Sequence, residues 1–207
     1  MDTKTFLQNT LGSEGHYCVF AFRTEDDRRI QKFYPSIDHI VDVAQNLDSQ
    51  GYDTYFALAT FKEPNSRKVN NVNKLKSFFL DLDCGATKDY PDQDQAIKAL
   101  GQFCRTLSLP KPMLVNSGRG VHAYWFLHEE VSVLDWVPVA EHLKKLCGVH
   151  RLLADPAVTA DAARVLRVPT THNYKTDPPS PVSYFAGDVP DTIDFDVFAS
   201  LLGMDTI

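Results

Sequence analysis

The sequence predicts an α+β domain, with a mixed or antiparallel sheet and helices packed on it. Two observations support this fold class. Short apolar stretches of strand character are interspersed with amphipathic helical patterns along the chain. In addition, "MLVNSGRGVHAYWFL" (113–127) has the form of two strands joined by a tight Ser-Gly-Arg-Gly turn, which is a β-hairpin.

The first half of the chain begins with a strand at 16–23, "HYCVFAFR". A helix follows, with Ser36 as its N-cap, apolar residues on one face and Gly51 as its stop. The stretch 54–61 is apolar, aromatic-rich and strand-like. The next dozen or so residues form a polar loop, and its length suggests a functional role.

In the rest of the chain, the sequence predicts a strand that carries Asp81 and Asp83, followed later by the hairpin. Helices are expected before and after this hairpin and at the end of the chain, at 92–107, 132–148 and 194–203. Pro138 must lie in the first turns of the middle helix or kink it, and 180–187 returns to strand. This order suits one sheet in a two-layer core like that of an RNA-recognition motif. No sharp linker interrupts it, so we expect a single domain over 1–207.

Composition narrows the class of protein. Hydrophobic residues make up 43% of the 207 and aromatic residues 11%, enough for a substantial core. No apolar run is long enough to span a membrane and the polar start is no signal peptide, so we expect a cytoplasmic protein with no membrane partner. The four cysteines are scattered without a C-x-x-C pair, which favours free, buried thiols and no structural zinc: Cys18, Cys84, Cys104 and Cys147.

Charge is unevenly distributed. The net charge of −6 counts against a protein dedicated to wrapping nucleic acid. Basic residues gather in "FKEPNSRKVNNVNKLK" (61–76) and again at Arg164, Arg167 and Lys175. Acidic overall with local cations, the chain fits an enzyme that acts on a charged substrate.

The stretch "FFLDLDCG" (78–85) carries the first candidate site. Side chains alternate along a strand, so Asp81 and Asp83 share one face while Leu80 and Leu82 take the other. Two carboxylates side by side repel each other unless a positive charge lies between them. A divalent metal would answer this need; a pair of Lys or Arg side chains, or exposure at the strand end, are the alternatives.

The second candidate is "NSGRGVHAYW" (116–125). Its glycines allow a tight turn whose N–H groups can face an anion, and Arg119 can bind a phosphate in bidentate fashion. His122 lies two residues into the returning strand and could donate to a phosphate oxygen. A plain β-turn with an exposed arginine and a half-buried histidine is the alternative.

The third candidate is "LLADPAVTADAARVLRVPTTHNYKT" (152–176), which supplies another acid followed by cations. Asp155 is expected at the end of a short strand, although it could be an ordinary turn or N-cap residue before Pro156. Asp161 competes with it as the third acid and could itself cap a helix at 162–167. Of the two, Asp155 is preferred.

The order of these three segments resembles the archaeo-eukaryotic primase superfamily. That family has two acids in its first motif, a Ser…His segment in its second and a further acid in its third. The resemblance spans about 52 to 184 and is nearest to the primase-polymerases of phages, plasmids and mobile elements. It implies a primase-type fold with a core like an RNA-recognition motif, in a bacterial or phage-infected cell. The chain lacks the zinc-binding cysteines of some members and ends soon after the third motif, so we expect one module of a larger replication protein.

The resemblance also implies roles for particular residues. The three acids would be catalytic and would hold Mg²⁺ or Mn²⁺ in a two-metal site: Asp81, Asp83 and Asp155. Ser117, Arg119 and His122 would hold the triphosphate of an incoming nucleotide, with further phosphate contacts from Arg167 and Lys175. Asn173 falls where some relatives have a nucleotide-contacting histidine.

The function implied is that of a template-dependent nucleotidyltransferase, a DNA primase, a DNA polymerase or both. Its substrates would be NTP or dNTP with a single-stranded DNA template and primer, and a helicase or helical priming domain is a possible partner. The basic loop Lys62 to Lys76 could run along the template, or could simply be solvated.

Two other functions compete with this one. A metal-dependent nuclease or nicking replication initiator would need a His-hydrophobic-His pair, and His122 and His128 are too far apart to form it. A non-catalytic module that binds single-stranded nucleic acid would leave the three acids unexplained.

Overall fold

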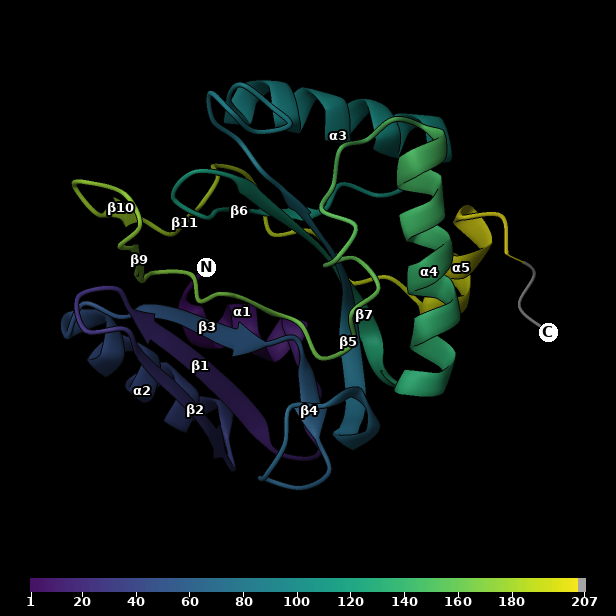
Figure 1. Cartoon of the computed structure of the whole chain (residues 1–207). Helices are drawn as coiled ribbons and strands as arrows, with labels where there is room; N and C mark the ends of the chain where they lie inside the picture. The colour runs from purple at the N-terminus through teal and green to yellow at the C-terminus, as the bar shows by residue number, and fades with distance from the viewer. Residues whose placement is uncertain (205–207) are drawn as a thin grey trace.

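Two antiparallel sheets form the framework of the computed structural model, which describes residues 1–204 (Figure 1). The smaller sheet has the strand order β2-β1-β3-β8, with bounds Arg28–Tyr34, Tyr17–Arg23, Asp53–Ala57 and Val165–Arg167. The larger sheet has the order β11-β6-β7-β5-β4, with bounds Ser183–Tyr184, Met113–Asn116, Val121–Ser132, Val72–Leu82 and Ala59–Phe61. A short ribbon pairs β10 (Ser180–Pro181) with β9 (His172–Asn173).

Helices pack on both sheets, so the predicted α+β class is confirmed. The α-helices that the structure describes are α1 Thr3–Thr10, α2 Ile37–Ser49, α3 Gln93–Leu107, α4 Val133–Val149 and α5 Phe195–Leu201, with a 3₁₀ turn at Val69–Asn71. None of these helices is both long and apolar enough to cross a membrane. The predicted domain, 1–207, ends three residues beyond the described part of the chain.

The expectation of one sheet is wrong, because the predicted strand 54–61 divides between two. The chain bends at Leu58, so that β3 pairs in the smaller sheet and β4 in the larger. The Leu58 N–H donates to the carbonyl of Arg164, 2.9 Å away, which satisfies the backbone where neither sheet does. A uniformly apolar run carries no signal of such a change of sheet.

Local sequence signals account for most of the helices. Ser36 caps α2, as predicted, by accepting the N–H of His39, and Ile40, Ala44 and Leu47 bury one face of it. Asp92, Ser132 and Asp194 cap α3, α4 and α5 in the same way. All four cysteines are free and buried, also as predicted.

The sequence did not predict α1 or β2. The helix α1 has only eight residues, too few for a clear periodic pattern, and β2 ("RRIQKFY") is an edge strand with charged residues. What holds α1 is tertiary contact. The ring of Phe6 is fully buried, with ring centroids at 5.9 Å from Phe56 of the smaller sheet and 5.1 Å from Tyr124 of the larger. The helix therefore joins the inner faces of the two sheets.

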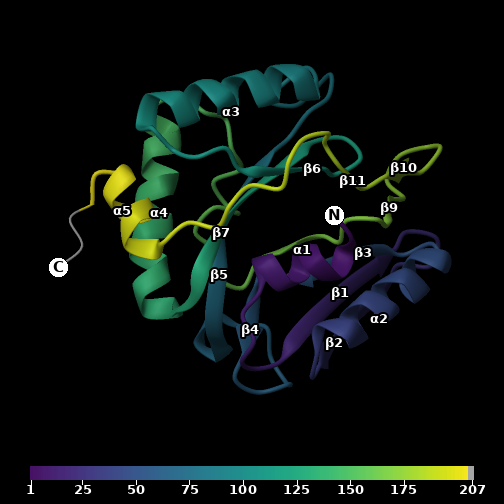
Figure 2. The same ribbon diagram turned by 180° about the vertical axis from the view of Figure 1, so that it is seen from behind.

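The opposite face of the larger sheet is covered by α3, α4 and α5, on the side away from the smaller sheet (Figures 1 and 2). Phe78 of β5 stacks on Trp136 of α4 at 5.5 Å and on Phe198 of α5 at 4.5 Å. The indole N–H of Trp136 donates to the carbonyl of Ser77. This packing fixes which face of β5 is buried and leaves its other face to line the junction of the sheets.

Phe6→Ala tests the role of α1. Removing a fully buried ring that bridges two sheets is expected to lower the free energy of unfolding by about 3–5 kcal/mol, measured by urea denaturation. The control Leu134→Ala removes a side chain that is 82% exposed and is expected to change it by less than about 0.5 kcal/mol. Equal effects of the two changes would contradict the bridging role.

Candidate active site

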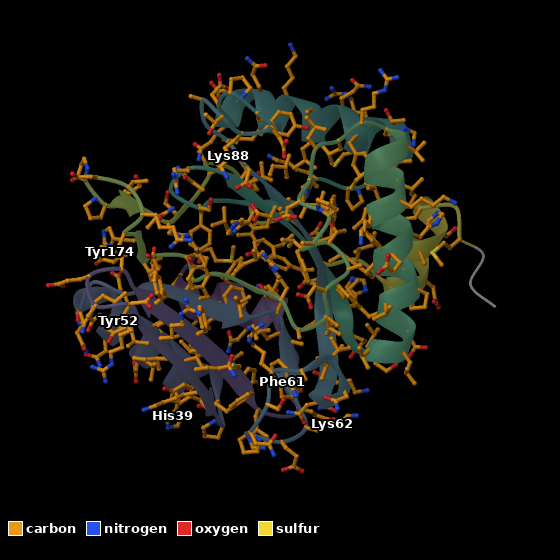
Figure 3. The ribbon with its side chains drawn as sticks, viewed as in Figure 1. His39, Tyr52, Phe61, Lys62, Lys88 and Tyr174 are labelled. Carbon is orange, nitrogen blue, oxygen red and sulfur yellow. The ribbon has the colours of Figure 1, made fainter. Side chains whose placement is uncertain are left out.

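A polar cavity of 310 Å³ lies at the junction of the two sheets. The end of β5, the turn between β6 and β7, β8, and the segment around β9 all contribute to it. Figure 3 shows Lys88 on the loop after β5 and Tyr174 at the far end of the smaller sheet, which mark two sides of this junction. Its lining residues are Tyr55, Asp81, Asp83, Cys84, Lys88, Ser117, Arg119, Gly120, His122, Arg164, Val165, Leu166, Arg167, Asn173 and Lys175.

The structure brings eight of the nine predicted site residues to this one cavity. They come from three segments far apart in the sequence: Asp81, Asp83, Ser117, Arg119, His122, Arg167, Asn173 and Lys175. The ninth, Asp155, does not line the cavity but lies directly beside it, since its N–H donates to the carbonyl of Asp81 at 2.8 Å.

The two acids of β5 face the cavity as the alternation predicted. Leu80 and Leu82 are fully buried, whereas Asp81 keeps 18% of its side chain exposed and Asp83 48%. Burial, together with the negative charges of Asp83 and Asp155, raises the pKa of Asp81 to about 7. A carboxyl group in this state gains most from a cation placed beside it.

His122 is the cross-strand neighbour of Asp81 and is almost fully buried. Its Nε2 lies 3.5 Å from Oδ1 of Asp81, and its Nδ1 is buried without a hydrogen-bond partner among the described residues. Burial and the nearby Arg167 and Arg164 lower the pKa of His122 to about 3. The imidazole is therefore neutral at physiological pH and acts as a hydrogen-bond group, not as a cation.

The turn between β6 and β7 needs its two glycines for space. Ser117 closes the turn: its N–H donates to the carbonyl of Gly120 at 3.0 Å, and its Oγ accepts the N–H of Gly120 at 3.1 Å. Gly118 has φ +95°, and a Cβ there would lie 2.6 Å from Cβ of Asn173. A Cβ on Gly120 would lie 2.5 Å from the carbonyl oxygen of Leu82. The turn is thus pressed against both the acidic strand and the β9 segment.

Asn173 holds this turn in place through hydrogen bonds. It is 4% exposed, its Nδ2 donates to the carbonyl of Ser117 at 2.9 Å, and its Oδ1 accepts the N–H of Lys175 at 3.0 Å. These bonds use its amide within the protein. Asn173 therefore holds the turn and the Lys175 backbone together at the cavity wall.

Arg167 is the buried cation of the site. It is 6% exposed, its guanidinium pairs with the fully buried Asp53, and it lies 4.9 Å from the ring centroid of Tyr55. By contrast, Arg119 and Lys175 are exposed at the cavity and free to reach outward. The site thus combines one buried, paired cation with exposed ones.

Two expectations for the third acid are wrong. Asp155 ends no strand: it lies in an irregular segment, and its Oδ1 accepts the N–H of Ala157 at 2.9 Å, as a turn residue does. Asp161 caps no helix, because 162–167 forms a turn and then β8; its Oδ1 accepts the N–H of Ala163. Proximity nevertheless favours Asp155, whose charge acts on Asp81, while Asp161 lies 4.0 Å from Arg164.

Among the lining side chains that can ionise, sequence reasoning missed three and left one unassigned. Tyr55 lies in a run taken only as strand, Cys84 was taken only as a free thiol, and Lys88 lies in a loop with no distinguishing pattern. Lys88 Nζ is 3.8 Å from Asp83 Oδ2. Arg164 was noted as a cation without a role; it lines the cavity, and its Nε is buried without a partner among the described residues.

The predicted basic loop Lys62 to Lys76 is only partly a loop, because β5 begins at Val72, and its cations do not form one continuous stripe. Lys62 and Lys74 lie at a groove beside the start of α4, and Lys76 donates to a carbonyl of α1. Figure 3 places Lys62 far from Lys88 and the cavity. Arg67 alone of these turns to the smaller sheet, where its Nε donates to Gln31 at 3.0 Å.

The acids suit a hard divalent cation. Among residues 1–204, no three His, Cys, Asp or Glu side chains form a ready-made metal cage. Mg²⁺, however, is commonly bound through one or two carboxylates together with substrate phosphates and water. Asp81 and Asp83 provide such a pair, and the raised pKa of Asp81 indicates a carboxylate short of positive charge. The donor set fits Mg²⁺ or Mn²⁺.

The chain is similar to a curated protein and to several solved structures. No model of a known protein family matches the chain. A curated relative, a "Replication protein" of Clostridium perfringens, is 30% identical over 137 residues, which cover 64% of this chain. The chain spans about a third (32%) of that relative's length.

Solved structures share the fold over nearly the whole chain. The AEP domain of the cyanophage S-2L primase-polymerase aligns with a TM-score of 0.66 at 18% identity, covering 91% of this chain and 89% of that one. The polymerase domain of Mycobacterium tuberculosis Ligase D, solved with DNA, aligns with a TM-score of 0.58 at 14% identity, covering 97% and 86%. The protein thus has the fold of the archaeo-eukaryotic primase domain, and the predicted resemblance is confirmed at the level of the fold. More particularly, it shares the fold of the AEP domain of a cyanophage primase-polymerase.

Asp83→Asn tests the repulsion between the two acids. Removing one charge is expected to stabilise the metal-free protein by about 0.5–1 kcal/mol at pH 8, because Asp81 then ionises with one like-charged neighbour fewer. The same change is expected to raise, at least about tenfold, the Mn²⁺ concentration needed for half-maximal thermal stabilisation. Asp161→Asn is the control and is expected to leave the Mn²⁺ response unchanged. A wild-type response in Asp83→Asn would separate Asp83 from cation binding.

Gly118→Ala tests the close approach of the turn to Asn173. The added methyl group meets Asn173 and forces alanine into positive φ, so a loss of about 1–3 kcal/mol in unfolding free energy is expected. In Gly148→Ala, near the end of α4, the new Cβ has no atom within 4 Å, and a neutral or stabilising effect is expected. A tolerated alanine at 118 would show that the turn can move away from β9.

Proposed function

We propose that this domain is a nucleotidyltransferase that joins nucleotides on a DNA template, as a primase, a polymerase or both. One observation carries the proposal: two carboxylates line a cavity whose other charged lining residues are all cations. Those cations are Lys88, Arg119, Arg164, Arg167 and Lys175. Such a site suits a polyanion that arrives with a divalent cation, which is the form in which a nucleoside triphosphate reacts.

The acids would hold the metal. Asp81 and Asp83 supply oxygen ligands, and Asp155, tied to Asp81 through the backbone, stands ready to complete the set. Bound Mg²⁺ or Mn²⁺ would offset the negative charge that develops on the attacking and leaving oxygens. The protein's own part is to hold these carboxylates in place, and a bound cation would favour the ionised form of Asp81.

The cations would hold the triphosphate. Arg119 and Lys175 are exposed and can turn to phosphate oxygens, while Arg167 is fixed by Asp53 and presents a positive wall. His122, neutral and buried, can donate one N–H to an oxygen in the cavity without adding charge. Ser117 and Asn173 act on the shape of the turn, so they support the nucleotide site through the position of Arg119.

The proposal that the substrates include DNA rests on the shared fold and on sequence similarity. The relative from Clostridium perfringens is named a replication protein, and the Ligase D polymerase domain is a structure with DNA. This chain spans about a third of that relative. A template, a primer and a helicase or helical priming domain are therefore proposed as partners by analogy with the whole relative.

The test is nucleotide incorporation. The purified domain, with a primed or a bare single-stranded template, dNTP or NTP, and Mg²⁺ or Mn²⁺, is expected to form product, and Asp81→Asn/Asp83→Asn to reduce the rate at least about 10³-fold. Asp155→Asn is expected to lose most of the activity and Asp161→Asn little. Wild-type turnover in the double variant would refute the proposed chemistry. A larger loss of activity in Asp161→Asn than in Asp155→Asn would make Asp161 the third acid in place of Asp155.

A further inference from the structure

The smaller sheet has one face that no helix covers in the part of the chain that the structure describes. In Figure 1 the strands of this sheet lie in front of α2. In Figure 2, which shows the opposite side, α2 lies in front of the strands. Along β1 the residues alternate accordingly. Val19 and Ala21 are buried towards the helices, whereas Phe20 and Phe22 on the open face are only partly buried.

A continuous row of side chains crosses this open face from the cavity to the sheet edge. Cross-strand register places Arg167 of β8 opposite Tyr55 of β3, Tyr55 opposite Phe20 of β1, and Phe20 opposite Gln31 of β2. The rings of Tyr55 and Phe20 are 5.9 Å apart between centroids. Three strand spacings of about 4.8 Å make the row about 14 Å long.

Arginines lie over the rings of this face. The guanidinium of Arg167 is 4.9 Å from the ring centroid of Tyr55, and that of Arg67 is 6.0 Å from Phe20. Arg67 also donates to Gln31, so it reaches the far end of the row. A second pair follows on the same face, with Arg29 at 5.5 Å from Phe22. Aromatic rings with interleaved cations on an open sheet are the features that bind single-stranded nucleic acid.

We propose that this row, Arg167–Tyr55–Phe20–Gln31 with Arg67 above it, binds the single-stranded DNA template as it approaches the cavity. Two consecutive bases pack against the partly exposed rings of Phe20 and Tyr55, and Arg67, which is only partly buried, neutralises a phosphate. Tyr55 and Arg167 belong to both the row and the cavity, so the strand passes from one to the other without a break. This inference deepens the proposed polymerase function and rests on it for the meaning of the bound strand.

The path crosses the strands and does not follow them. The turn between β1 and β2 carries Glu25, Asp26 and Asp27, whose negative charges repel phosphates at that end of the strands. The row lies away from this turn and leads to the exposed edge strand β2. Charge and geometry therefore favour the same direction.

Binding of labelled dT₁₅, followed by fluorescence anisotropy in EDTA at low salt, tests the row without metal or nucleotide. Phe20→Leu keeps an apolar side chain but removes the ring, and a roughly tenfold weaker Kd is expected. Arg67→Gln is expected to weaken binding about three- to tenfold and to flatten its salt dependence. Thermal unfolding of each variant separates loss of binding from loss of fold.

Neighbouring arginines on β2 provide a matched control. Arg29 is the cross-strand neighbour of Phe22 on the open face. Arg28 is the cross-strand neighbour of Arg23 on the other face. Arg29→Gln is expected to weaken dT₁₅ binding about threefold and Arg28→Gln to leave it unchanged. Equal losses in both would mean that overall charge, not this face, attracts the DNA, and would overturn the proposal. Tighter binding of U₁₅ with the same dependence on Phe20 would assign the face to RNA and overturn it as well.

Extension of a primed template by the same variants separates this inference from the proposed function. Phe20 does not line the cavity, so Phe20→Leu is expected to raise the KM for template about tenfold and leave the KM for nucleotide unchanged. Wild-type extension with unaltered template KM in Phe20→Leu would reject the row. If the wild type extends no primer, and the variants nevertheless lose dT₁₅ binding, the row is upheld as a DNA site and the polymerase function is rejected.

Discussion

The register between β5 and β7 is the constraint on which the site depends. It sets Asp81 opposite His122 and, on the other face, Phe78 opposite Trp125. A slip of one residue would turn the acids into the aromatic core around Trp136 and Phe78 into the cavity. The packing of α4 and α5 on Phe78 is therefore also what keeps the carboxylates at the junction of the sheets.

A few hydrogen bonds then bring distant parts of the chain to these acids. Asp155 is tied through its N–H to Asp81, Asn173 through its amide to Ser117, and Arg167 through its guanidinium to Asp53. Each of these groups is satisfied within the protein, so each serves as a support for a neighbour that faces the cavity. The exposed cations Arg119, Lys88 and Lys175 stand on this frame. Buried supports with exposed cations suit a site that binds a polyanion arriving from solvent.

The parts of the structure that the sequence predicted are those with local causes. The alternation in "FFLDLDCG" placed the acids on one face, and caps such as Ser36 placed the helices, because both effects act within a few residues. The prediction failed where distant contacts decide. Nothing near Leu58 signals a change of sheet, Phe6 holds α1 only through both sheets, and Asp155 sits in an irregular segment held by Asp81. Tyr55 reached the cavity through the pairing of β3 with β8, another distant contact. Lys88 lies near Asp83 in the sequence, but its loop carries no pattern that distinguishes it.

The central claim is that Asp81 and Asp83, with Asp155 beside them, hold a divalent cation at this junction. Cleavage of the protein backbone by Fe²⁺ bound in place of Mg²⁺, in the presence of ascorbate and peroxide, tests it most directly. The account predicts cuts near 81–83, 117–122 and 154–155, suppressed by excess Mg²⁺ and absent from Asp81→Asn/Asp83→Asn. Cuts elsewhere, or the same cuts in the double variant, would contradict it.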